Sequence, residues 1–232
     1  MHRIVYALFV FFAVCCANPV TADARRPPEP TLPQAAVEAV VRVDVGGRIT
    51  GSGIVITPQG HVVTSSGTIL GYQGRPITVG EDRVPATVVA VDDRHQIALL
   101  AAARPLPRWA RLDAAPGPAR DDPARIVAYA DMSSEPSMVE RRSCAARVGD
   151  PHFHGDSSDS LDLHDLLIAD MTGEIEGFKQ EGAAVFSLRT GRLAGVVIGR
   201  LRTTGMTRLI AMPASTAGAL LDSRRIAVPP AD

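Results

Sequence analysis

Short apolar segments that alternate with polar residues recur along this chain, and they constrain its fold more than any other feature. The stretch "VVRVDV" places Val41, Val43 and Val45 on one face of a strand, because neighbouring side chains of a strand point to opposite faces. "GSGIVITPQGHVVTSS" predicts two strands around residues 57–60, since proline second and glycine fourth favour a type I turn. Antiparallel β-structure is therefore the expected architecture.

Two groups of such segments follow one another, at about residues 37–102 and 124–212, with a connector rich in proline and charge at 103–123. The segment "PASTAGALLDSRRI" predicts a helix over about 214–225, with Ser215 as its N-cap. The further strands are expected at Pro76–Val79, Ala86–Val91, Ile97–Ala101, Ile126–Ala130, Met138–Val148, Leu166–Met171, Ala183–Ser187, Leu193–Arg202 and Thr207–Met212. This pattern predicts an all-β domain over 37–226, made of two antiparallel Greek-key barrels and a C-terminal helix.

The first residues predict a cleaved signal peptide, 1–24. Arg3 precedes the apolar run "IVYALFVFFAVCCA", which is shorter than the roughly 20 residues that a membrane helix needs. Small residues in "VTADA" favour cleavage after Ala24 or Ala22, and residues 25–36 are expected to form an exposed Pro-rich lead-in. We therefore expect a secreted or periplasmic protein with no membrane insertion after cleavage, and an uncleaved anchor is the alternative.

Composition argues against several function classes. The net charge is −1, which gives no electrostatic basis for binding nucleic acid or an anionic membrane. Cleavage after Ala24 removes Cys15 and Cys16 and leaves Cys144 as the one cysteine of three, so the mature chain has no internal disulfide. Its length of 208 residues (232 − 24) is enough for a hydrophobic core to stabilise it alone.

Four stretches of the chain match the motifs of one enzyme family, in that family's order and spacing. "GSGIVITPQGHVVTSSGTIL" is similar to the family's "GSGVIID-x-GYILTNNHVV", "VDDRHQIALLAA" to its "x-D-P-x-x-D-I-A-L-L-K-V", "EGAAVFSLRTGRLAGVVIG" to its "S-G-G-P-L-L-N-x-x-G-x-V-I-G-I", and "RLIAMPASTAGALLD" to its "G-x-G-F-A-I-P-S-x-x-A-x-x-x-x-D". The chain thus resembles the HtrA (Deg) type of trypsin-like serine protease over about residues 36–226, and this resemblance implies the chymotrypsin double-barrel fold. No segment of PDZ length follows, so we expect no such accessory domain.

The resemblance also implies that the catalytic triad is lost. The family's histidine corresponds to Gly67, its aspartate to Gln96 and its serine to Glu181. Glycine supplies no base, a neutral amide does not stabilise an imidazolium, and a carboxylate would oppose the oxyanion formed beside it. The glycine of the family's oxyanion hole corresponds to Lys179, although an ion pair of Lys179 with Glu181 in a solvated loop is the alternative interpretation. A pseudoprotease without catalytic residues or cofactor is expected.

The family holds substrates as an added antiparallel strand along its second barrel, where main-chain hydrogen bonds supply the affinity. The matching segment is "AGVVIGRL". The resemblance implies that a peptide would pair with Val197, Ile198, Gly199 and Arg200, unless the protein's own loops cover this edge. The expected partner is an extended peptide or a secreted or envelope protein.

An active serine endopeptidase with a rearranged site is a second hypothesis. His95 lies beside Asp92 and Asp93, and Ser65 and Ser66 lie near the position of the family's histidine. A packing or surface role is nevertheless the expected one for both His95 and His61.

A metal-binding module is the third hypothesis, because "GDPHFHGDSSDSLDLHDLL" is rich in aspartate and histidine. The H-x-H spacing puts His152 and His154 on one side of an extended strand, and Asp156 and His164 could complete a zinc or calcium shell. A polar loop inserted between two strands is the alternative.

Overall fold

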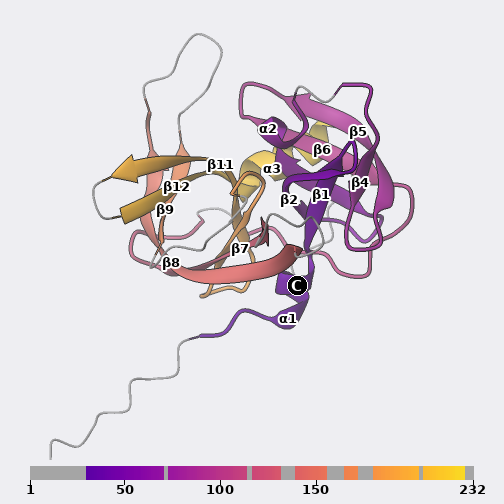
Figure 1. Ribbon diagram of the computed structural model, residues 1–232. Coiled ribbons are helices and arrows are strands. Elements are labelled where there is room, and N and C mark those ends of the chain that lie inside the picture. The colour runs from indigo at the N-terminus through magenta and orange to yellow at the C-terminus, as the bar shows by residue number, and fades with distance from the viewer. Residues whose placement is uncertain are drawn as a thin grey trace, which may run out of the picture.

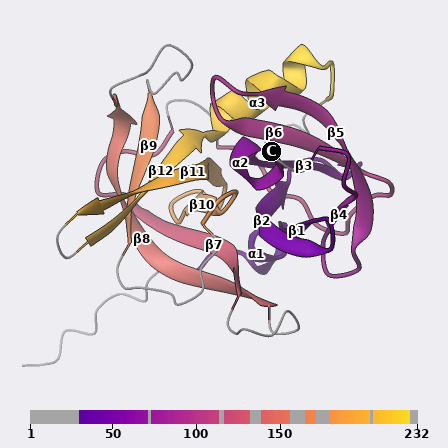
Figure 2. The same ribbon diagram turned by 45° about the horizontal axis from the view of Figure 1, so that its top comes forward.

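The computed structural model describes residues 30–70, 73–113, 117–131, 139–155, 165–171, 180–203 and 206–227. Within these ranges twelve strands form two closed six-stranded antiparallel barrels that stand side by side (Figures 1 and 2). The predicted double barrel is confirmed. No helix in the described ranges is long and apolar enough to cross a membrane. The predicted signal peptide, residues 1–24, lies outside them.

Barrel one holds β1 (Val40–Val45), β2 (Arg48–Val55), β3 (His61–Ser65), β4 (Ile77–Val79), β5 (Val84–Asp92) and β6 (Ile97–Ala102). They pair in the order β1-β2-β3-β6-β5-β4, and β4 closes the barrel on β1. The alternation in β1 is confirmed, because Val41, Val43 and Val45 enter the barrel core. Asp44 on the other face is also buried, and its carboxylate accepts two hydrogen bonds from Arg42.

Barrel two holds β7 (Pro123–Asp131), β8 (Val139–Phe153), β9 (Leu166–Met171), β10 (Ala184–Ser187), β11 (Leu193–Thr203) and β12 (Met206–Pro213), in the order β10-β11-β12-β9-β8-β7. Its core includes Cys144, a free cysteine whose pKa burial raises to about 11. β8 continues to Phe153, beyond the predicted end at Val148. Irregular pairing with β9 around Asp150 lets the strand cross a polar stretch that looked like a loop.

Three helices complete the described chain. α1 (Gln34–Glu38) begins inside the predicted lead-in and buries Ala36, so the last residues of that lead-in belong to the packed domain. α2 (Ser66–Ile69) follows β3 directly. α3 (Ala214–Ser223) contacts β6 of barrel one and β11 and β12 of barrel two (Figure 2). Its N-cap is Pro213, with φ −55 and ψ 148, so the prediction of Ser215 as the cap is wrong by two positions.

A shared hydrophobic core and a few polar contacts hold the barrels together. Phe186, Leu193 and Leu221 are among the buried residues of this core, which draws on both barrels and on α3. The Tyr129 amide of barrel two donates to Oγ of the fully buried Ser52 in barrel one at 2.8 Å. Because a buried amide without a partner is costly, this bond fixes how β7 meets β2.

Candidate functional site

One wall of the candidate site is the turn in which β3 runs into α2. The Ser65 hydroxyl caps α2 by accepting a hydrogen bond from the Gly67 amide at 3.2 Å. Serine suits this position because its oxygen satisfies an amide that has no partner within the helix. The Ser66 amide donates to the Gln96 carbonyl at 2.9 Å. The predicted positions Gly67 and Gln96 are therefore held close together in barrel one.

The other wall belongs to barrel two, where the chain enters β10. The Ser52 amide donates to the Glu181 carbonyl at 3.0 Å, and the Gly182 amide donates to the Val197 carbonyl at 2.9 Å. Gly182 has φ +74, and a β-carbon there would clash with the Ser52 carbonyl oxygen. Glycine is required by this close approach. The backbone of Glu181 is thus anchored to both barrels.

Glu181 faces Gly67 at the junction of the two barrels. A β-carbon placed on Gly67 would lie 3.4 Å from Oε2 of Glu181 and 3.4 Å from Oγ of Ser65. Gly67 and Glu181 are exposed, and Gln96 is half-buried. The structure therefore gathers the three predicted positions at one place, two from barrel one and one from barrel two.

We refer to Ser65, Gly67, Thr68, Gln96 and Glu181 as the junction cluster. Its side chains offer hydroxyl groups, one amide and one carboxylate, and none of the five is a histidine. The Thr68 hydroxyl is buried and has no hydrogen-bond partner among the described residues. A serine hydrolase needs a hydroxyl activated by a neighbouring base. The cluster itself supplies no imidazole for that role.

The two histidines of barrel one make local contacts. Nδ1 of His61 lies 2.7 Å from Oγ1 of Thr57 in the β2–β3 turn, and burial lowers the pKa of His61. Nδ1 of His95 lies 2.7 Å from Oδ2 of Asp92 in the β5–β6 turn, where the Asp92 carboxylate also accepts the His95 amide. Each contact joins residues of one turn.

Lys179, the predicted oxyanion-hole position, lies in 172–179, outside the described residues. The described chain resumes at Gln180, whose carbonyl accepts a hydrogen bond from the Ala183 amide at 3.0 Å. That turn leads Glu181 and Gly182 into β10.

The predicted peptide-binding edge lies on β11, beside Glu181. The Val197 amide donates to the Ala183 carbonyl at 2.8 Å, and the Val197 carbonyl accepts a hydrogen bond from the Gly182 amide, so both main-chain groups of Val197 already bond to its own chain on this side. Beyond a bulge, Gly199 and Arg200 pair with β12 on the opposite side. No described strand pairs with residues 198–200 on the Glu181 side. We refer to residues 198–200 as the open edge.

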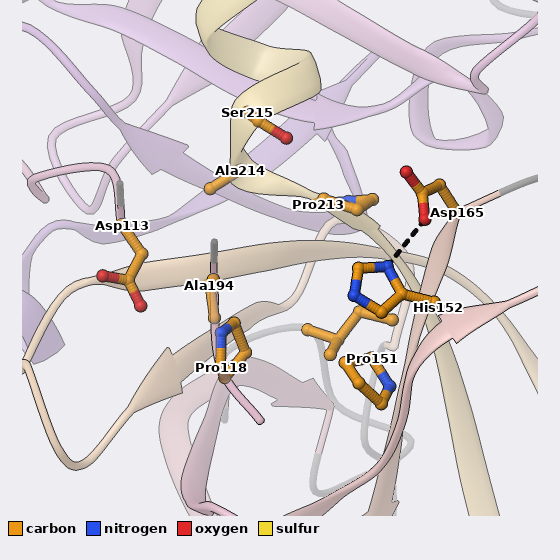
Figure 3. A pocket seen from close by; sticks show the side chains of 11 residues that line it. Asp113, Pro118, Pro151, His152, Asp165, Ala194, Pro213, Ala214 and Ser215 are labelled. Carbon is orange, nitrogen blue, oxygen red and sulfur yellow. Dashed lines mark hydrogen bonds and ion pairs between the residues drawn. The ribbon is translucent and has the colours of Figure 1, made fainter. Parts of the chain in front are cut away.

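The aspartate- and histidine-rich stretch lies in barrel two, where β8 ends and β9 begins. Nδ1 of His152 lies 2.7 Å from Oδ1 of Asp165, and the Asp165 amide donates to Nδ1 of His154 at 3.5 Å. His152 and Asp165 line a cavity of about 300 Å³ beside the start of α3 (Figure 3). Asp156 and His164 lie outside the described residues. The described ranges hold no group of three metal-binding side chains, so the predicted metal site depends on those two residues.

Asp165 and Ser52 are the residues of these sites that no sequence pattern singled out for these contacts. Asp165 stood among many similar aspartates, and only the fold pairs it with His152. Ser52 looked like one more strand residue, yet its amide holds Glu181 and its hydroxyl holds Tyr129.

Comparison with protein families matches residues 51–196 to the family described as trypsin-like peptidase domain. The match runs from β2 into β11 and includes Gly67, Gln96 and Glu181. No curated protein matches the chain.

Several solved proteases share the fold. Rv3671c from M. tuberculosis H37Rv in an inactive form is 22% identical, with a TM-score of 0.63, and the alignment covers 85% of this chain and 93% of that one. The MamO protease domain from Magnetospirillum magneticum is 20% identical, with a TM-score of 0.62 and coverage of 81% and 97%. The HtrA-type protease AlgW, solved with a decapeptide, is 14% identical, with a TM-score of 0.64 and coverage of 82% and 65%. Similarity at such identities supports a common fold only.

Proposed function

The chain belongs to the trypsin-like peptidase domain family, and on that basis we propose that it is a pseudoprotease, a non-catalytic member that binds an extended peptide or protein segment. The family match and the HtrA-type neighbour support the fold and the location of the site. A fold by itself does not fix a function. The proposal therefore depends on the side chains at the junction of the barrels.

One observation carries the proposal: Glu181 faces Gly67 where the two barrels meet, with Oε2 3.4 Å from the position of a Gly67 β-carbon. The family's chemistry needs a nucleophilic hydroxyl beside an imidazole that a carboxylate orients. In the junction cluster the carboxylate of Glu181 stands at the nucleophile's position, Gly67 at the position of the imidazole, and the neutral Gln96 at the position of the orienting carboxylate. A negative charge at Glu181 also disfavours the oxyanion of acyl transfer.

Incubation of the chain lacking residues 1–24 with denatured casein and a fluorophosphonate probe tests the loss of catalysis. We expect neither cleavage nor labelling. The matched variant carries Ser65→Ala and Ser66→Ala, the two serines nearest to Gly67. Labelling that this variant loses, or casein turnover that one substitution abolishes, would favour the active endopeptidase and overturn the proposal.

The open edge supports a binding role. An extended segment added to β11 would form main-chain hydrogen bonds with those groups of residues 198–200 that β12 does not take, independent of any catalytic side chain. Val197 is not part of this proposed site, because its own chain occupies both of its main-chain groups. AlgW was solved with a decapeptide, and we infer that this chain takes a comparable ligand.

Peptides of about ten residues, arrayed and screened for binding, test this role. For a peptide that binds through the Ile198 amide, Ile198→Pro is expected to weaken affinity about tenfold, because proline removes that main-chain donor. An N-methylated copy of the peptide should lose affinity similarly and leaves the protein unchanged. Full affinity in a folded Ile198→Pro variant together with full affinity of the N-methylated peptide would move the site elsewhere.

We further propose that the protein acts in the periplasm or outside the cell, with an envelope or secreted protein as its partner. The arginine, apolar run and small residues within 1–24 support export. N-terminal sequencing of the mature protein is expected to begin at Arg25. A cytoplasmic protein that retains Met1 would contradict the proposal.

A further inference from the structure

Glu181 places a carboxylate at the junction of the barrels. Its side chain is exposed, and it makes no ion pair or side-chain hydrogen bond with any described residue. The main chain on either side of it is fixed, by the Ser52 amide and by the bond from Gly182 to Val197. A carboxylate that stands on a fixed main chain and pairs with no described residue is available to a ligand.

The Glu181 carboxylate also lies close to where a ligand on the open edge would pass. Gly182 bonds to the Val197 carbonyl at 2.9 Å, so Glu181 stands next to the end of the edge at Ile198. Its Oε2 extends across to Gly67, where it lies 3.4 Å from the position that a β-carbon would take. A cationic side chain of the ligand could approach Oε2 from the exposed side of Glu181.

The opposite end of the open edge carries the opposite charge. Arg200 is exposed and makes no ion pair with a described residue. It lies three residues from Val197, which corresponds to about 10 Å along a strand. Because Glu181 adjoins Val197 through Gly182, a ligand would meet Glu181 and Arg200 at two different places along the open edge.

The direction of β11 determines the order in which the residues of a ligand meet these two charges. β11 runs from Leu193 to Thr203, and an antiparallel ligand therefore passes Arg200 first and Glu181 later. We propose that the open edge selects extended segments in which an acidic residue precedes a basic residue by about three positions. This inference rests on the proposed peptide-binding function and assigns Glu181 and Arg200 the selection of the ligand.

Two peptides of identical composition test the inference. Both have about ten residues in a valine–serine background with blocked termini; one carries glutamate three positions before lysine, and the other carries the two exchanged. We expect the glutamate-first peptide to bind about tenfold more tightly by fluorescence anisotropy, because both ion pairs form and both like-charge contacts are avoided. High salt should reduce this ratio.

Variants at Glu181 and Arg200 test whether these two charges cause the preference for the glutamate-first peptide. Glu181→Gln and Arg200→Gln should each reduce the ratio to about threefold, and the double variant should abolish it. Glu140→Gln removes an exposed carboxylate of β8 and should leave the tenfold ratio intact.

The outcomes separate this inference from the function on which it rests. Equal affinity of the two peptides, a preference for the lysine-first peptide, or a ratio that survives the double variant would overturn the charge-order inference and leave peptide binding standing. Failure of both peptides and of the whole peptide array to bind would overturn the pseudoprotease's binding role itself.

Discussion

The local sequence explains why glycine stands at position 60 but not why it stands at position 182. Gly60 closes the turn after Thr57, and its amide donates to the Thr57 carbonyl at 3.1 Å, as proline second and glycine fourth in that turn predict. Gly182 is required because the Ser52 carbonyl of the other barrel approaches it closely. The first constraint is local and can be read from four residues. The second arises only when two distant segments pack together.

Gly182→Ala is expected to destabilise the protein by about 3 kcal/mol or more, because the new β-carbon meets a backbone oxygen and the residue must keep a left-handed conformation. Gly199→Ala is the control, since a β-carbon there has nothing within 4 Å, and should change stability by less than about 0.5 kcal/mol. Urea unfolding of both variants measures the difference. Equal stabilities would mean that Ser52 and Gly182 are not in the close contact described.

Restoring the family's side chains by Gly67→His, Gln96→Asp and Glu181→Ser is expected to yield little or no proteolysis. Acyl transfer also needs preorganised amides around the oxyanion, and one missing donor costs roughly 10²–10³ in rate. Lys179 stands where the resemblance implies a glycine for that purpose.

Casein hydrolysis compares this triple variant with a quadruple variant that adds Lys179→Gly, and the quadruple variant should be faster. If the triple variant is as active as the quadruple one, Lys179 does not limit the oxyanion hole.

Strands and helices could be predicted from sequence better than their ends. The period of two located the strands of both barrels, because one face of each strand enters a core. β8 runs past Val148 because bulges let it carry polar residues to Phe153, which alternation does not reveal. α3 begins at Ala214 rather than after Ser215, because the extended backbone of Pro213 ends β12 and starts the helix without a side-chain cap.

Two neighbouring leucines of α3 test what this helix contributes. Leu221 is fully buried in the core shared by the barrels, and Leu220 is only partly buried. Leu221→Ala is expected to cost about 2–5 kcal/mol, because it leaves a cavity between the barrels, and Leu220→Ala about 1 kcal/mol. Thermal and urea unfolding provide the comparison. Similar losses of stability in the two variants would mean that Leu221 of α3 does not pack in the core shared by the barrels.

The way the two barrels meet was not predictable from pattern. Alternation gives each barrel its inner face, but the contact of Tyr129 with Ser52, and of Arg141 with the Val40 carbonyl, joins residues far apart in the chain. The positions Gly67, Gln96 and Glu181 came from family resemblance rather than from periodicity, and the structure gathers them at one place. Lys179, Asp156 and His164 lie outside the described residues, so their predicted roles stay predictions.

Tyr129 provides a pH-dependent test of the barrel junction. Burial raises its pKa, and its hydroxyl contacts Arg141 at 2.8 Å and Glu81 at 3.2 Å. Tyr129→Phe should cost about 1–2 kcal/mol at pH 7. Above the ordinary tyrosine pKa of 10.0, the unfolded chain ionises at Tyr129 before the folded one does, so wild-type stability falls as pH rises.

The stability deficit of Tyr129→Phe should therefore narrow as pH rises above about 10, and urea unfolding at pH 7 and at several pH values above 10 measures it. A deficit that widens with pH would mean that the folded state favours the ionised phenol.

The anchors of the junction are contacts of peptide groups: Ser52 to Glu181, Gly182 to Val197, and Ser66 to Gln96. None of them uses the side chain at 67, 96 or 181. A lineage could therefore exchange those three side chains, and the chemistry they perform, without having to rebuild the scaffold around them. The architecture is in this sense evolvable, because the main chain can keep its arrangement while the side chains on it change. A saturation-mutagenesis map should tolerate diversity at 67 and 181, disfavour β-branched residues at 96, where φ is +55, and reject nearly all substitutions at 182.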